Sequence, residues 1–138
     1  DAMPTAAGKR PALLLRARAA VDLHHAAGGT GAATDGLRRV TESLQTWLAD
    51  HPQDATAWEA LAATSQALGL DLRSMRAGAE ARAAVGDLNG AIDRLRAAQA
   101  VSRKDGGQDF IEASVIDTRL RQLVAQRRQI ALEARNGN

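Results

Sequence analysis

Residues 69–88 read GLDLRSMRAGAEARAAVGDL and contain two glycines that each precede an aspartate, a pattern typical of consecutive short-linked helices. Gly69 precedes Asp71, and Gly86, seventeen residues further on, precedes Asp87. Glycine ends helices readily because it adopts left-handed backbone angles, and an aspartate side chain accepts hydrogen bonds from the free N–H groups that begin the next helix. The stretch therefore predicts a helix from Asp71 to Gly86 with a short turn at each end.

Five further helices are predicted from apolar residues that recur every three or four positions. They run from Pro11 to about Ala27, from Thr34 or Asp35 to the break at 50–54, from Asp54 to Gly69, from Asp87 to a polar loop at 102–108, and from Asp109 to about Ala134. The last helix is the longest and carries its apolar stripe at Ile116, Leu120, Leu123, Val124 and Ile130. Short turns make consecutive helices antiparallel neighbours, so the expected fold class is all-α.

The composition supports packed helices and excludes several other classes of protein. The 138 residues are 45% hydrophobic but only 2% aromatic, and none is cysteine. β-Sandwiches and barrels depend on β-branched and aromatic residues, and disulfide scaffolds and cysteine-based zinc sites need cysteine. The formal net charge is only +2, without the dense basic stripe that is typical of nucleic-acid binders. We therefore expect no nucleic acid among the partners.

The chain divides into one domain and two short ends. Residues 1–10 carry Pro4 and Gly8 without helical periodicity, and they are predicted to be a linker or a loose end. Residues 11–134 form the predicted helical domain, and residues 135–138 are expected to fray. The chain begins with Asp1 rather than methionine, and no signal-peptide pattern precedes the first helix. We therefore expect a processed chain or a piece of a longer protein.

Two groups of residues have the spacing of a helical repeat. Pro52 and Trp58 are spaced as a terminal proline and the tryptophan that follows it, and Trp58–Ala62 has the form Trp-x-x-Leu-Ala. The segment Gly86–Ile92 has the form Gly-Asp-Leu-x-x-Ala-Ile, and Ala98 falls on the next small position. These residues resemble the tetratricopeptide repeat, a 34-residue helix–turn–helix unit. The resemblance implies an α-solenoid of about two and a half units with a long C-terminal capping helix.

The sequence also departs from that repeat at two positions. Ser65 stands where the family usually has tyrosine, and Gly78 stands where the family packs a large residue. The helix that begins at Asp71 can serve as the second helix of one unit or the first helix of the next, so the number of repeats stays open. An ordinary helical bundle is the alternative fold.

Two longer segments resemble a more particular family. Arg76–Leu95 begins with an Ala-rich helix, Arg76-Ala77-Gly78-Ala79-Glu80, that leads into a Gly-Asp turn, and Ile116–Leu123 reads Ile-Asp-Thr-Arg-Leu-Arg-Gln-Leu. In this order and separation they resemble the C-terminal domain of bacterial periplasmic zinc metalloproteases that assist outer-membrane β-barrel assembly. The resemblance implies a periplasmic location and a parent protein with an N-terminal catalytic domain. The implied partners are the outer-membrane assembly machinery, unfolded substrate and that catalytic domain.

The catalytic His-Glu-x-x-His of that family is missing from this sequence, whose histidines are His24, His25 and His51. His24 and His25 are adjacent on a predicted helix and point about 100° apart, whereas a zinc-binding pair lies one helical turn apart. His51 precedes Pro52 in a turn and has no histidine near it. We expect no catalytic residue, metal ligand, cofactor or enzymatic activity in this chain. Zinc is expected only in a catalytic domain of the parent.

The resemblance to the repeat family also implies a binding groove, because the first helix of each repeat lines the concave face of the solenoid. The groove positions are Thr56, Glu59, Ala63 and Gln66, followed by Arg73, Arg76, Glu80 and Ala83 if the fourth helix also faces inward. Arginine there can hold a peptide carboxylate through two hydrogen bonds, and a solvated helix face is the alternative interpretation. Arg76→Glu is expected to weaken partner binding while helicity is kept. The arginine pairs at 119 and 121 and at 127 and 128 are expected to face solvent.

Three functions follow from these observations. The leading hypothesis is a non-catalytic protein-interaction domain that docks a periplasmic metalloprotease onto the outer-membrane assembly machinery or holds an unfolded β-barrel substrate. The second is a free-standing repeat adaptor or scaffold of another envelope system, such as pilus assembly. The third is a nucleic-acid-binding helical domain that uses the arginine-rich second half of the chain.

Overall fold

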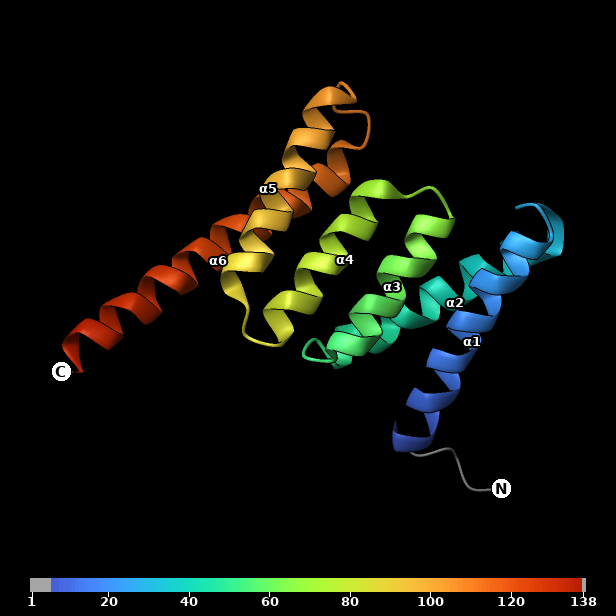
Figure 1. Ribbon diagram of the computed structural model, residues 1–138, viewed down its shortest axis with the longest axis horizontal. Helices are drawn as coiled ribbons and strands as arrows, with labels where there is room; N and C mark the ends of the chain where they lie inside the picture. The colour runs from blue at the N-terminus through green and yellow to red at the C-terminus, as the bar shows by residue number, and fades with distance from the viewer. Residues whose placement is uncertain (1–5, 138) are drawn as a thin grey trace.

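Six helices make up the structure, a computed structural model that describes residues 6–137 (Figure 1). In chain order they are α1 (Ala6–Ala26), α2 (Gly31–Asp50), α3 (Ala55–Ala67), α4 (Asp71–Ala84), α5 (Leu88–Lys104) and α6 (Phe110–Asn136). No strand occurs between residues 6 and 137. The prediction of an all-α fold with six helices is therefore confirmed for this range.

The helices follow one another across the molecule as three antiparallel hairpins (Figure 1). The α3–α4 hairpin lies in the middle, with α1 and α2 packed against α3, and with α5 and α6 packed against α4. Within residues 6–137, the backbone of α2 does not come close to that of α4, and the backbone of α3 does not come close to that of α5. The structure therefore consists of two three-helix groups that are joined through the central hairpin.

Each three-helix group has its own hydrophobic core, and α4 contributes to both. The first core is formed by buried residues of α1, α2 and α3, among them Leu13, Leu37, Leu44 and Leu61, together with Ala77 and Ala81 of α4. The second core contains Ile92, Leu95, Ile116 and Leu123, together with Leu72 and Ala79 of α4. Alanine on both sides of α4 lets neighbouring helices approach it closely, because close packing depends on how far side chains project.

Several predicted helix ends are confirmed. The carboxylates of Asp54, Asp87 and Asp109 each accept a hydrogen bond from the backbone N–H three residues further on, at 3.2, 2.9 and 3.1 Å. Gly69 and Gly86 have φ angles of +77° and +85°. These positive angles favour glycine over residues with a Cβ atom, so Gly69 and Gly86 end their helices as expected, and Asp87 starts the helix that follows Gly86.

Two other predicted caps are wrong. Asp71 is the first residue of α4, and its side chain caps nothing because Leu70 occupies the capping position. Helix α2 begins at Gly31, so Thr34 lies inside its first turn. The Thr34 Oγ1 atom lies 3.3 Å from Nδ1 of the buried His24, and this pairing links α2 to α1 instead of capping α2.

The predicted linker at residues 1–10 is partly wrong. Helix α1 begins at Ala6, five residues before the expected start at Pro11, and residues 1–5 lie outside the described range. Pro11 removes only one intrahelical hydrogen bond, the bond to the carbonyl of Ala7. Arg10 forms an ion pair with Asp54 at the start of α3, and this contact holds the first turns of α1 against the domain.

The C-terminal helices also differ from the prediction. Helix α5 continues to Lys104, so Ser102 is buried in a helix rather than exposed in a loop. Helix α6 continues to Asn136, which makes part of the predicted frayed end helical, and residue 138 lies outside the described range. Ile130 was expected in the buried stripe but is 50% exposed. The reason is length, because α6 has 27 residues and α5 has 17.

Candidate interaction surface

The predicted groove residues lie on two different surfaces. Thr56, Glu59 and Gln66 are exposed on α3, as is Ala63. Glu59 is two residues, about 200° around the helix, from Leu61, which is buried in the first core. The α4 residues of the predicted groove face α2 and α6 instead. The structure therefore does not bring the two halves of that groove together.

Arg73 faces α2, whereas Arg76 and Glu80 face α6. Arg73 borders a small surface hollow together with Arg38 and Glu42 of α2. Arg76 Nε donates a hydrogen bond to Glu112 Oε1, and Glu80 Oε1 accepts one from Arg119 Nε. Ala83 is half-buried against the second core. Only the α3 residues of the predicted groove are thus freely exposed.

The two ion pairs between α4 and α6 take Arg76 and Glu80 out of reach of a ligand. Only 17% of the Arg76 side chain and 10% of the Glu80 side chain are exposed. The Arg76 guanidinium also lies 6.0 Å from the centre of the Trp58 ring, at the limit of a cation–π contact. Arg76 therefore connects α3, α4 and α6. The expectation that Arg119 faces solvent is also wrong, because it pairs with the buried Glu80.

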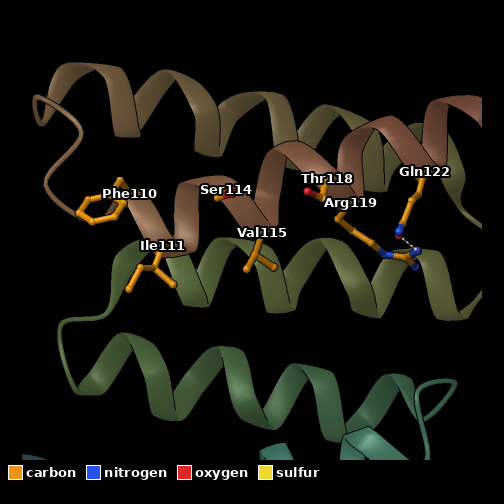
Figure 2. Close-up of a pocket in the computed structure, with 7 residues that line it drawn as sticks. All are labelled: Phe110, Ile111, Ser114, Val115, Thr118, Arg119 and Gln122. Atoms are coloured by element: carbon orange, nitrogen blue, oxygen red, sulfur yellow. Dashed lines mark hydrogen bonds between the residues drawn. The ribbon is translucent and has the colours of Figure 1, made fainter.

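An apolar patch lies at the N-terminal end of α6, beside these ion pairs (Figure 2). We call it the apolar shelf and define it by Phe110, Ile111 and Val115, whose exposed fractions are 72%, 71% and 41%. The shelf borders an open hollow of about 590 Å³ whose other lining residues are Ser114, Thr118, Arg119 and Gln122. Ile111, Val115, Thr118 and Gln122 follow one another at helical spacing, so the hollow runs along α6.

Arg119 supplies the charged group of this surface. Its Nη1 donates a hydrogen bond to Gln122 Oε1 at 3.2 Å (Figure 2). Its Nε donates a hydrogen bond to Glu80 Oε1. The contacts described for Arg119 use two of the five N–H donors of a guanidinium. Arg119 lines the hollow, and its remaining N–H groups can donate to a carbonyl or carboxylate oxygen of a bound chain.

Our sequence reasoning missed the apolar shelf. It placed the apolar stripe of the last helix on Ile116 and Leu123, which are indeed buried in the second core. The signal for the shelf is a second apolar pair, Ile111 and Val115, four residues apart and one position before the Ile116 stripe. Periodicity alone does not tell which of two adjacent stripes a neighbouring helix covers.

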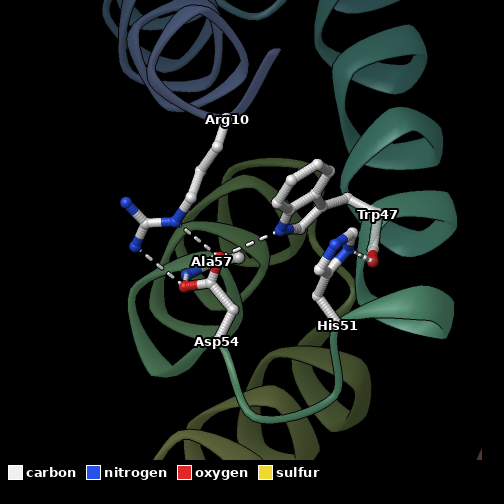
Figure 3. Close-up of polar contacts among 5 residues, drawn as sticks. All are labelled: Arg10, Trp47, His51, Asp54 and Ala57. Atoms are coloured by element: carbon white, nitrogen blue, oxygen red, sulfur yellow. Dashed lines mark hydrogen bonds and ion pairs between the residues drawn. The ribbon is translucent and has the colours of Figure 1, made fainter. Parts of the chain in front are cut away.

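A second polar cluster joins α1, α2 and α3 at the carboxylate of Asp54 (Figure 3). Arg10 donates two hydrogen bonds to it, from Nε at 2.7 Å and from Nη2 at 2.9 Å. Trp47 Nε1 donates a third at 2.9 Å, in addition to the capping bond from the Ala57 N–H. The His51 ring stacks on the Trp47 ring at a centroid distance of 3.7 Å. The cluster is a structural junction between three helices.

The charge of Asp54 follows from this geometry. The hydrogen bonds from Arg10 hold the pKa of the Asp54 carboxyl far below its usual range, and those from Trp47 and Ala57 act in the same direction. Burial opposes them but is outweighed. The hydrogen bond to Asp54 in turn raises the pKa of Arg10. Both groups are therefore ionised at neutral pH.

Neither a group of metal-binding side chains nor a membrane-spanning helix is found among the described residues. No group of three or more His, Asp and Glu side chains gathers there in a way that could hold a metal ion. His24 pairs with Thr34, and His51 stacks on Trp47. Among residues 6–137, no helix combines the length and apolar character needed to cross a membrane.

Comparisons with known proteins do not add to these observations. No protein-family description matches the chain. No curated protein and no solved structure matches it either. The function is therefore argued from the surfaces of this chain and from the resemblance in its sequence.

Proposed function

We propose that this chain is a non-catalytic domain that binds other proteins through the apolar shelf on α6. The observation that carries the proposal is the exposure of Phe110 and Ile111, two adjacent large apolar side chains that are each more than two-thirds open to solvent. Large apolar side chains clustered on a surface favour a partner that covers them. The polar rim formed by Thr118, Arg119 and Gln122 gives such a partner a fixed orientation.

The shape of this surface favours a helical segment as ligand. The residues that line the hollow extend from Phe110 to Gln122 along α6, so an amphipathic helix that lies beside this part of α6 can place apolar residues on the shelf. An acidic residue near one end of that ligand would meet the open donors of Arg119. The proposed binding therefore combines apolar anchors with one charged contact.

We also propose that the first two hairpins stack in the manner of tetratricopeptide repeats. Helix α1 packs on α3, as successive first helices do in such a solenoid, and Trp58 is buried between the two hairpins. Helix α3 does not extend this stacking to α5 within the described residues. The proposed repeat character is thus strongest in α1–α4.

The sequence resemblance supports a proposal about the parent protein. The two segments that carry it, Arg76–Leu95 and Ile116–Leu123, lie in α4, α5 and α6 and share the second core. We propose a periplasmic zinc metalloprotease as the parent, with zinc in its catalytic domain and the outer-membrane assembly machinery or unfolded substrate as partners. A His-Glu-x-x-His motif upstream of Asp1 in the full gene product would support this proposal. A different upstream domain would contradict it.

Peptide selection tests the proposed binding surface. Short random peptides displayed on phage are selected against the immobilised chain, and the enriched peptides are synthesised and titrated by isothermal calorimetry. We expect enriched peptides with apolar residues one helical turn apart, and at least a tenfold loss of affinity for Ile111→Asp. The loss follows because a carboxylate on the shelf must be desolvated when an apolar anchor covers it.

The matched control is Leu15→Asp. Leu15 lies on α1 and is 70% exposed, close to the 71% of Ile111. The control should bind the selected peptides as the unmodified chain does, and both variants should keep the helical circular dichroism spectrum. Peptides that bind Ile111→Asp with unchanged affinity would rule out the apolar shelf as the binding surface.

A further inference from the structure

Helix α1 is apolar on two opposite faces. Its inner face packs on α2 and α3 through Leu13 and Ala17, which are buried. On its outer face, Leu15 and Leu23 are 70% and 60% exposed. Three alanines, Ala12, Ala19 and Ala26, are exposed on the same face. The spacing from 12 through 15, 19 and 23 to 26 is that of one continuous helical stripe. An apolar stripe that stays exposed opposite the packed face of a helix favours a partner that covers it.

This outer face has no partner within the described residues. Helix α1 stands at one end of the row of helices and touches only α2 and α3 (Figure 1). Both neighbours lie on the side of Leu13 and Ala17. The outer face, defined by Leu15, Ala19 and Leu23 with Ala12 and Ala26 at its ends, is therefore open along the length of the helix.

We propose that the outer face of α1 binds the same face of a second copy of this chain, with the two helices antiparallel and crossing at Ala19. The stripe is symmetric about this residue. Leu15 and Leu23 are each four positions from Ala19, so Leu15 of one copy faces Leu23 of the other. Ala12 and Ala26 are each seven positions away and pair in the same way. The small Ala19 side chain lets the two backbones approach at the centre.

Charges on one border of the face favour this pairing. Arg18 and Asp22 lie on the border that adjoins α3, and neither belongs to an ion pair within residues 6–137. In an antiparallel pair related by a two-fold axis, the same border of each helix meets its counterpart. Arg18 of one copy then lies beside Asp22 of the other, and this contact occurs twice. A parallel pair would not place these opposite charges together in this symmetric way.

The size of the face sets the expected strength. From Ala12 to Ala26 the helix is about 21 Å long at 1.5 Å per residue. A pair of such helices buries less area than the roughly 800 Å² per partner of a stable complex. We therefore expect a weak dimer with a dissociation constant of about 10–500 μM. This inference is independent of the proposed peptide binding, because it uses a different surface of the molecule.

Sedimentation equilibrium of the chain from about 5 to 1,000 μM tests the dimer, a range that brackets the expected constant. The unmodified chain should shift from monomer to dimer, and Leu23→Glu should stay monomeric throughout. Arg18→Asp should weaken the dimer several-fold because it places like charges beside each other, and adding Asp22→Arg should restore it. Ile111→Asp, which changes the proposed peptide surface, should dimerise normally. A chain that stays monomeric up to the highest concentration would overturn the proposal.

Single cysteines determine the direction of the two helices, since the chain has no cysteine of its own. Under mild oxidation Ala19→Cys should form a covalent dimer, because residue 19 meets its counterpart at the crossing point. Ala12→Cys should not, because the two copies of residue 12 lie fourteen positions apart, or about 21 Å. A mixture of Ala12→Cys and Ala26→Cys should cross-link to each other. Rapid covalent dimers of Ala12→Cys alone would contradict the antiparallel arrangement.

Discussion

Asp54 joins three helices through a single carboxylate. Its carboxylate caps α3, receives two hydrogen bonds from Arg10 of α1 and a third from Trp47 of α2. Only 10% of its side chain is exposed, whereas 40% of the Arg10 side chain is exposed. The Trp47 and capping bonds are therefore shielded from water, while solvent weakens the contribution of Arg10. One side chain thus fixes the relative positions of three helices.

Asp54→Asn tests the contribution of this charge, because asparagine keeps an oxygen that can cap the helix. We expect the free energy of unfolding at pH 7 to fall by about 1 kcal/mol, the scale of a partly exposed ion pair. Urea denaturation followed by circular dichroism measures it. The control is Asp50→Asn, at an exposed position of α2 that has no ion pair among the described residues. If both variants lower the free energy of unfolding equally, the ionised Asp54 contributes no more to stability than an unpaired surface aspartate.

The lowered pKa of Asp54 predicts that its contribution to the free energy of unfolding depends on pH. The pKa of Asp54 is lowered in the folded chain, whereas an unfolded aspartate has a pKa of about 3.9. Its contribution to stability is therefore complete above about pH 5 and is lost as the pH falls below 4. The stability difference between the unmodified chain and Asp54→Asn should shrink between pH 5 and pH 2. A difference that stays constant over this range would contradict the assigned ion pair.

At the scale of the elements, α4 is the helix on which the others depend. Its two alanine-containing sides enter both cores, and the border between those sides carries Arg76 and Glu80. These residues form ion pairs with Glu112 and Arg119 of α6. The ion pairs thus join α4 to α6 beside the second core, to which both helices contribute.

Arg76→Glu tests this interface. The substitution places a carboxylate next to the buried Glu112, so we expect it to lower the free energy of unfolding by about 2–3 kcal/mol. The binding effect that the sequence suggested for this variant would then be hidden by a loss of stability. Adding Glu112→Arg restores opposite charges and should recover most of the loss, as urea denaturation of both variants would reveal. If Arg76→Glu alone is as stable as the unmodified chain, the ion pair is not part of the α4–α6 interface.

At the scale of the whole molecule, the helices are packed in the middle and uncovered at both ends. Helix α1 exposes its outer face at one end, and the last turns of α6 extend past α5 at the other (Figure 1). Arg127 marks the end of the part of α6 that packs on α5. Its Nη1 donates a hydrogen bond, at 2.9 Å, to Oδ1 of Asn89 in the first turn of α5. All described residues after Arg127 are exposed.

A shortened chain tests whether these last turns contribute to the fold. Removal of residues 130–138 should lower the free energy of unfolding by less than about 1 kcal/mol, because positions 130–137 are all exposed. Leu123→Ala is the contrasting variant, since Leu123 is fully buried in the second core and its truncation should lower stability by about 2–5 kcal/mol. Urea denaturation compares the two. If the shortened chain loses as much stability as Leu123→Ala, the end of α6 packs on the domain.

Local sequence patterns are enough to predict the helical class, the six helices and many of their ends. These features are local: apolar spacing of three and four residues, aspartate caps at 54, 87 and 109, and glycines at 69 and 86 that adopt positive φ angles. Tertiary packing determines which face of each helix is covered. It turned Arg76 and Glu80 towards α6, left the apolar shelf exposed, and placed the start of α1 against Asp54. The physical reason is that periodicity identifies the faces of a helix, whereas burial depends on neighbours that are distant in the sequence.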